Sequence, residues 1–212
     1  SCIGDDKSQI AELLDLYKSL GITRLVALRG DLPSGQVDMG ELPFALDLVK
    51  FIREYSGDHF RIEVAAYPEM HPQARSFEFD VDNLVNKYQA GANASITQFF
   101  YNADSYLYLR DTLEKRGIDT VAQPLVAGIM PITNSSNLVR FADSCGADIP
   151  RYVRKRLADF GDDRTAIREF GFDVVYRLCE RLISEGVPAM HFYSMNKVEP
   201  NKRLVEALGL IA

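Results

Sequence analysis

The chain has 212 residues, 47% hydrophobic and 25% charged, which is the balance of a globular protein with one sizeable core. Its net charge of -6 argues against a protein that works by neutralising nucleic-acid phosphates or an anionic membrane surface. No apolar run reaches the ~20 residues of a membrane span, and residues 1–20 lack the pattern of a signal peptide. We expect a single-domain cytoplasmic protein.

Strands and helices are expected to alternate along the whole chain. Apolar, β-branched runs predict buried parallel strands, and the stretches between them have helical spacing. Asp104 is expected to cap the helix that follows it, and Gly117 and Gly186 to end helices. In chain order the predicted elements are helix 6–20, strand 24–28, helix 42–55, strand 61–66, helix 80–90, strand 94–99, helix 104–116, strand 121–129, helices 134–145, 150–158 and 162–185, strand 189–193 and helix 199–208.

This alternation fits either a closed (β/α)8 barrel or an open doubly wound sheet. Polar or unusual residues follow the end of every predicted strand, and a barrel gathers all these ends into one mouth, so we prefer a (β/α)8 TIM barrel. Residues 1–3 resemble the tail of a sixth strand. We therefore expect roughly the last six βα units of a barrel that is incomplete at its N-terminus.

The cysteines and histidines suggest neither a metal site nor a disulfide framework. There are three of each, and none form a Cys-x-x-Cys pair or another pair at metal-ligand spacing. The sequence also lacks a GxGxxG, P-loop or GxSxG motif. We expect no metal, and no motif points to the usual dinucleotide or hydrolase folds.

Two groups of polar residues are candidates for a site, each with an ordinary alternative. Asp31 follows a buried strand in Leu28-Arg29-Gly30-Asp31-Leu32-Pro33, and is either a solvated turn residue or a carboxylate in the barrel mouth that stabilises a developing cation. Asp80, Asn83 and Lys87 share one helical face, which is either solvated or converges on a phosphate or ribose.

Gln98 and Phe141 are further candidates. Gln98 ends an apolar strand, where its amide must bond either to backbone or to a ligand with paired donors and acceptors. Phe141 lies on a predicted helix, where an aromatic side chain usually belongs to the core. Spacing alone therefore predicts a barrel with a polar mouth able to hold a cofactor.

Five sequence blocks, in the same order, resemble the methylenetetrahydrofolate reductase family across essentially the whole chain. They are ALRGDLP at 27–33, VAAYPEMHPQA at 64–74, KYQAGANASITQFF at 87–100, GIMPI at 128–132 and HFYSMN at 191–196. The resemblance implies a FAD-containing (β/α)8 barrel that passes a hydride from NADH or NADPH to the flavin and then to methylenetetrahydrofolate, with ping-pong kinetics. It also implies a homo-oligomer, because such barrels often associate.

The resemblance assigns a role to individual residues. Asp31 would lie near the flavin ring, tune its reduction and favour the iminium form of folate. Gln98 would bind the pterin, and Phe141 would stack on the nicotinamide and then on the folate, with Asn137, Met195 and Lys197 as further substrate contacts. The FAD positions would be Leu28, Arg29, Gly30, Asp31, Phe44, Ala45, Ala65, Tyr67, His71, Asp80, Asn83, Asn86, Lys87, Ile96 and Tyr193.

Several positions depart from the family pattern. Phe44 replaces a common Tyr, Asn86 a basic residue, Ala127 a Pro and Lys197 an Arg, and Asn137 stands where a folate-contacting Gln is often found. The family's first strand ends in a glutamate that acts as general acid, and that segment has no counterpart in this sequence. We therefore expect these 212 residues to be part of a longer enzyme.

Two other functions fit the sequence less well. A flavin-binding or partner-docking remnant would not need Asp31, Gln98 and Phe141 together. An unrelated phosphate-binding barrel enzyme, such as an aldolase, would present a Schiff-base lysine at a strand end, and none is visible.

Overall fold

The computed structural model describes residues 1–32, 35 and 38–211, and Pro33 of the first sequence block lies outside this part. Its centre is one parallel sheet whose strand order follows the sequence, so that each strand pairs with the next. The strands are β1 (Arg24–Ala27), β2 (Arg61–Ala66), β3 (Ala94–Thr97), β4 (Leu125–Ile129) and β5 (Met190–Phe192).

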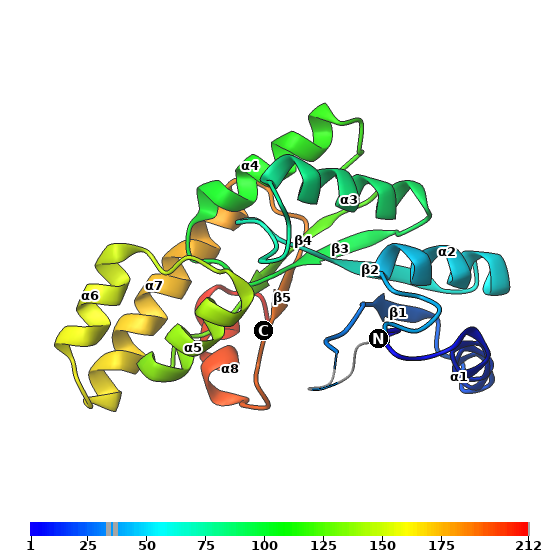
Figure 1. Cartoon of the computed structure of the whole chain (residues 1–212). Coiled ribbons are helices and arrows are strands. Elements are labelled where there is room, and N and C mark those ends of the chain that lie inside the picture. Colours follow the sequence, from blue (N-terminus) through cyan, green and yellow to red (C-terminus); the bar gives the residue numbers. More distant parts are fainter. Residues whose placement is uncertain (33–34, 36–37, 212) are drawn as a thin grey trace.

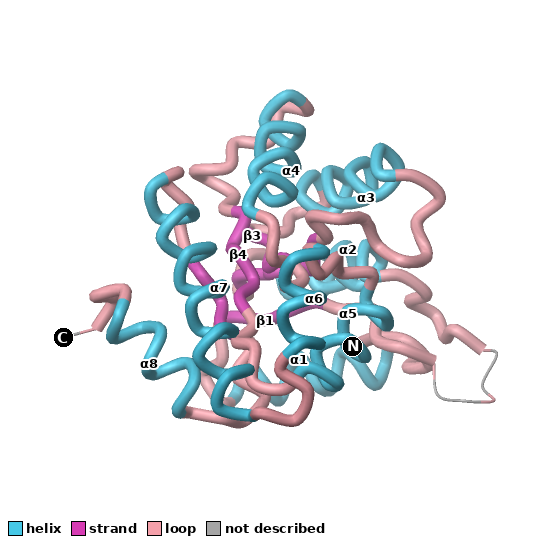
Figure 2. Tube along the Cα trace, turned by 90° about the vertical axis from the view of Figure 1, so that its left-hand side faces the viewer, coloured by secondary structure: helices cyan, strands magenta, loops and turns pink. Residues whose placement is uncertain are grey.

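The helices cover one side of this curled sheet and leave the other side open (Figures 1 and 2). The helices are α1 (Lys7–Ser19), α2 (Ala45–Ser56), α3 (Phe77–Gln89), α4 (Ala103–Lys115), α5 (Ser135–Cys145), α6 (Arg151–Asp159), α7 (Arg164–Ser184) and α8 (Glu199–Ala207). Helices that are neighbours around the outside contact each other in the order α1, α2, α3, α4, α7 and α8.

Side-chain alternation in β2 explains which face is covered. Ile62, Val64 and Ala66 are buried against the helices, whereas Glu63 and Ala65 point to the opposite face and are only half-buried. Successive residues of a strand point to opposite faces, so the apolar set selects the helix side. On the open side, Val26 of β1 is 50% exposed.

The structure is therefore part of a (β/α)8 barrel, which confirms the predicted fold class. The sixth strand expected at residues 1–3 is not formed. Instead, the backbone N–H groups of Cys2 and Ile3 both donate to the carbonyl oxygen of Arg29, at 3.1 and 2.9 Å. A single shared acceptor holds this segment beside the end of β1 without making a ladder.

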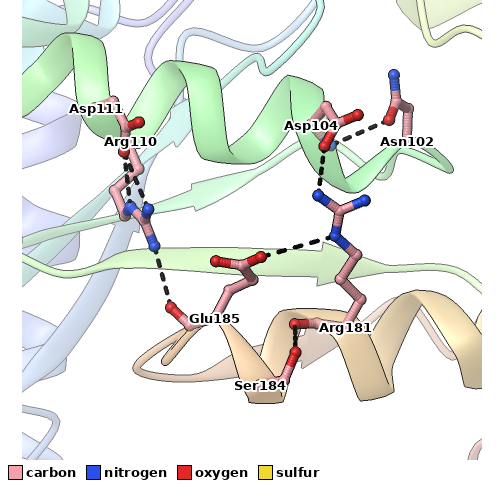
Figure 3. A network of polar contacts seen from close by, with 7 residues as sticks. All are labelled: Asn102, Asp104, Arg110, Asp111, Arg181, Ser184 and Glu185. Carbon is pink, nitrogen blue, oxygen red and sulfur yellow. Dashed lines mark hydrogen bonds and ion pairs between the residues drawn. The ribbon is translucent and has the colours of Figure 1, made fainter.

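The expected capping of α4 by Asp104 is wrong, because the cap is Asn102. The Asn102 side chain accepts a hydrogen bond from the backbone N–H of Asp104, which lies in the first turn. Asp104 instead pairs with Arg181 of α7 at 2.7 Å, and Arg181 also approaches Glu185 at 3.8 Å (Figure 3). This polar network joins α4 to α7 at the surface.

The two predicted helix ends are confirmed. Gly117 (φ 84°) and Gly186 (φ 74°) both adopt the left-handed conformation just after α4 and α7. Glycine reaches this conformation without the steric cost that a Cβ imposes.

Candidate functional site

A first cavity of about 570 Å³ opens at the carboxyl ends of β1 and β2, against α2 and α3. Its wall combines apolar and aromatic side chains with charged ones, which suits a ligand that has both a flat ring and a charged part. The cavity is lined by Leu28, Arg29, Gly30, Asp31, Phe44, Ala45, Leu46, Asp47, Ala65, Tyr67, His71, Gln73, Ala74, Phe79, Asp80, Asn83 and Lys87.

Lys87 provides a cation in the wall of this first cavity. Its Nζ donates to the carbonyl oxygen of Ala65 at 2.8 Å. Burial lowers the pKa of Lys87 to about 8, and the charge of Asp80 partly offsets this effect. An ammonium has three donors, so two remain for a ligand besides the one used by Ala65.

The loop after β2 forms another part of the wall. Asp80 Oδ2 accepts the backbone N–H of His71 at 2.8 Å, and the His71 ring lies edge-on to the Tyr67 ring, with centroids 4.6 Å apart. His71 Nδ1 accepts the backbone N–H of Gln73 at 3.0 Å, and burial lowers the pKa of His71. Because Nδ1 accepts this hydrogen bond, the proton of the neutral ring lies on Nε2.

Gln73 also bridges the two loops that border the first cavity. Its Oε1 accepts a hydrogen bond from Arg29 Nη1 at 2.9 Å, while Arg29 Nε donates to the carbonyl oxygen of Gly30 at 3.1 Å. The Arg29 guanidinium, just after β1, is thus oriented by two acceptors, the Gly30 carbonyl oxygen and Gln73 Oε1.

A second cavity of about 240 Å³ lies between α5, the ends of β4 and β5, and the start of α8. Met195 (φ 48°) and Asn196 (φ 57°) form a left-handed turn at its edge, a conformation that costs energy for residues other than glycine. The lining residues are Met130, Pro131, Thr133, Asn134, Asn137, Leu138, Phe141, Tyr193, Ser194, Met195, Lys197, Pro200 and Asn201.

Asn201 supports this turn from α8. Its Nδ2 donates to the carbonyl oxygen of Lys197 at 2.8 Å, and its Oδ1 is buried with no partner among the described residues. Lys197 in turn donates its backbone N–H to Ser194 at 2.9 Å.

Gln98 lies at the end of β3, between the strands that border the two cavities, although it lines neither of them. Its Oε1 accepts the backbone N–H of Phe99 at 3.0 Å. Its Nε2 donates to no atom of the described residues, so the amide keeps a free donor.

The structure brings most of the residues predicted for FAD to the first cavity, but three lie elsewhere. Asn86 is exposed on α3, Ile96 lies in β3 outside both cavities, and Tyr193 lines the second cavity. Among the predicted substrate contacts, Asn137, Phe141, Met195 and Lys197 all line the second cavity, and Asp31 lines the first.

Phe141 belongs to the core and also borders a cavity. Its ring is half-buried, packs against the core and lines the second cavity. Its expected stacking on the nicotinamide and the folate stays a prediction.

Sequence reasoning missed several lining residues. In the first cavity these include Gln73 and Phe79, and in the second Asn134, Ser194 and Asn201. Gln73 and Phe79 lie within two residues of His71 and Asp80, and the sequence could have predicted Asn134 as a helix N-cap. Asn201 carried no local signal.

Within the described ranges, no helix is long and apolar enough to cross a membrane. Across the same part of the chain, no three His, Cys, Asp or Glu side chains gather where they could hold a metal ion.

A partial barrel with two cavities at the carboxyl edge of its strands has the arrangement that barrel enzymes use for their active sites. The family model described as methylenetetrahydrofolate reductase matches residues 1–209. The chain belongs to this family, which sets aside an unrelated aldolase-type barrel.

Two relatives illustrate the similarity. The 5,10-methylenetetrahydrofolate reductase of Pectobacterium carotovorum is 38% identical over 212 residues, covering 99% of this chain and 68% of that protein. The probable methylenetetrahydrofolate reductase (NADPH) of Caenorhabditis elegans is 34% identical and covers 99% of this chain but 32% of that protein.

A solved structure has the same fold. It is a Clostridium thermocellum protein described as binding two copies of 5-methyl-5,6,7,8-tetrahydrofolic acid, with a TM-score of 0.56 and 19% identity. The match covers 85% of this chain and 66% of that one. At this identity the likeness shows the fold.

Proposed function

We propose that the protein carrying this chain reduces 5,10-methylenetetrahydrofolate to 5-methyltetrahydrofolate with NADH or NADPH, through bound FAD. The family match and the names of its relatives support the folate substrate and a nicotinamide co-substrate. The observation that carries the proposal is the pair of cavities on either side of Gln98, since the reaction needs room for a cofactor and a substrate at one reacting centre.

The chemistry of the residues that line the first cavity supports FAD as the proposed cofactor. Leu28, Phe44 and Ala65 offer an apolar wall to a flat ring, and Lys87 offers a buried cation with two unused donors to a phosphate. Asp80 and Asn83 add acceptors on the same helix face for ribose hydroxyls. FAD, when bound, supplies hydride transfer between the nicotinamide and the folate.

Position 86 has no cation and lies outside the lining of the first cavity. Asn86 is exposed on α3 and does not line the first cavity, so the phosphate grip is proposed to rest on Lys87 alone from this helix.

Three residues are proposed to act on the substrates. Asp31, in the wall of the first cavity, places a negative charge where a cationic iminium of folate would be stabilised. The free amide donor of Gln98 would bind the pterin, and the Phe141 ring would stack on the nicotinamide or on the folate. The nicotinamide and the folate would occupy the same binding site one after the other.

Initial-rate kinetics test this function. With FAD-loaded protein, formation of 5-methyltetrahydrofolate should require a nicotinamide, and double-reciprocal plots at several fixed concentrations of the second substrate should be parallel. Intersecting lines would contradict the shared site, and binding of folate and FAD without product would favour a binding protein instead.

A further inference from the structure

Glu69 joins the two cavities through a contact between distant parts of the chain. It lies in the loop after β2, between Tyr67 and His71 of the first cavity. Its Oε2 accepts the backbone N–H of Asp148 at 2.7 Å, and Asp148 lies in the connection that follows α5. Its Oε1 receives a longer hydrogen bond, 3.4 Å, from the hydroxyl of Ser105 on α4.

The same two segments also approach each other closely beside this bond. Gly146 ends α5 in the left-handed conformation (φ 71°), and a Cβ built there would lie 3.1 Å from Pro72 Cγ and 3.5 Å from the carbonyl oxygen of Met70. The C-terminal end of α5 is therefore packed on the loop of the first cavity, and Glu69 provides the charged hydrogen bond of that contact.

The loop after β2 does not depend on Glu69 for its own shape. The backbone N–H of His71 donates to Asp80 at 2.8 Å, and that of Ala74 donates to the carbonyl oxygen of His71 at 2.8 Å. These bonds would remain if the Glu69 carboxylate were removed.

Helix α5 is held differently at its two ends. Asn134 caps its N-terminus, accepting the backbone N–H of Asn137 at 2.8 Å. After its C-terminal end, the backbone N–H of Asp148 is held by Glu69. Phe141 and Asn137, which line the second cavity, lie between these two anchors.

We infer that Glu69 is a positioning residue that sets helix α5, and with it Phe141 and Asn137, relative to the first cavity. This inference rests on the proposed function, because it predicts an effect on substrate binding. Removing the carboxylate frees the C-terminal end of α5, so the second cavity loses its alignment while the first keeps its shape.

The test compares Glu69→Ala with Glu69→Gln, whose amide oxygen can still accept the N–H of Asp148. In Glu69→Ala, the KM values for the nicotinamide and the folate should rise about 10-fold, the effect of losing one charge-assisted hydrogen bond, while the Kd for FAD stays within about twofold. In Glu69→Gln, both KM values should stay close to those of the wild type. Ser105→Ala should change neither the KM values nor the Kd for FAD appreciably.

A matched control separates positioning from general loss of stability. Asp119 also accepts backbone N–H groups, from Val121 and Ala122 at 2.9 and 3.1 Å, but it lies before β4 at the opposite end of the barrel. Asp119→Ala should lower the melting temperature and leave both KM values unchanged. Equal losses of FAD and substrate affinity in Glu69→Ala, or unchanged KM values, would overturn the inference.

Hydrogen exchange tests the same inference without any ligand. Glu69→Ala should speed exchange in residues 142–149 and leave residues 67–74 as in the wild type. Unchanged exchange in 142–149 would overturn the role of Glu69. A wild-type protein that shows neither FAD binding nor turnover would instead contradict the proposed function, and the exchange result would still decide the role of Glu69.

Discussion

The hydroxyl of Tyr193, just after β5, reaches across β4 and donates to the backbone carbonyl of Thr97 on β3, at 2.9 Å. Gly128 of β4 lies beneath this contact, and its backbone N–H donates to the Thr97 hydroxyl at 2.8 Å. The absence of a side chain at position 128 is what lets three strands meet at the edge where the two cavities open.

Gly128→Ala should therefore destabilise the fold. A Cβ at this position would lie 2.1 Å from the Thr97 carbonyl oxygen and 2.8 Å from Tyr193 Cε2, so backbone must move. We expect a loss of about 2–3 kcal/mol in the free energy of unfolding, measured by urea denaturation.

Gly161→Ala is the control for this change, since no atom lies within 4 Å of a Cβ there and only the positive φ of 53° opposes it. Its cost should be about 1 kcal/mol. Equal losses in the two variants would show that the contact over β4 does not constrain Gly128.

Lys87 should make FAD binding depend on pH. Burial lowers the pKa of Lys87 to about 8 without ligand, and a phosphate beside the ammonium would raise it, so binding takes up a proton. FAD affinity should therefore fall as the pH rises from about 7 to about 9. Fluorescence titration of the protein freed of FAD measures this.

Lys87→Met should lower FAD affinity by about 10- to 100-fold and flatten that pH dependence. Lys115→Met, which removes an exposed charge on α4, is the control and should behave as the wild type. A Lys87→Met protein with the wild-type pH profile would show that Lys87 does not face the phosphates.

Gln98→Ala should separate the two halves of the reaction. Without the amide, the rate of folate reduction should fall by about 10- to 100-fold, because a donor to the pterin is lost. Reduction of the flavin by NADH should stay close to the wild-type rate, since the nicotinamide does not need Gln98. Stopped-flow absorbance measures both steps.

Gln123→Ala is the matched control, because the Gln123 amide donates to the carbonyl oxygen of Ala92 at the other end of the barrel. It should change neither rate. Equal slowing of both half-reactions in Gln98→Ala would mean that Gln98 positions the flavin and not the folate.

Two arginines should differ in their effect on stability. The Arg53 guanidinium donates to the carbonyl oxygens of Gly91, Gly57 and Phe60 and to Asn93 Oδ1, so Arg53→Ala leaves several acceptors unpaired and should cost about 2–4 kcal/mol. Arg181→Ala removes only a surface network and should cost less than about 1 kcal/mol. Similar losses in a denaturant titration would contradict this account.

The sequence predicted most helices and strands because each has its own hydrophobic periodicity or capping residue. Where a predicted helix or strand begins at the wrong residue, a nearby side chain explains the error. Strand β4 begins at Leu125 and not at 121, because the Asp119 carboxylate accepts the N–H groups of Val121 and Ala122 and holds a turn there. Helix α3 begins at Phe77 because Ser76 caps it, a signal that the polar face at 80–87 obscured.

Contacts between loops were not predictable from spacing. The bonds of Arg29 to Gln73 and of Glu69 to Asp148 depend on how loops at the strand ends meet, and neither bond follows from a periodic pattern in the sequence. Ile96 and Tyr193 lie on strand ends whose position relative to the cavities follows only from the curl of the sheet. The expected self-association, the cytoplasmic location and the incomplete N-terminus stay predictions.

The visible absorption spectrum of the FAD-loaded protein under anaerobic conditions tests the central claim most directly. NADH or NADPH should bleach the flavin band, and adding methylenetetrahydrofolate should restore it as 5-methyltetrahydrofolate forms. A protein that takes up no flavin, or whose bleached band does not return with the folate, would contradict the account.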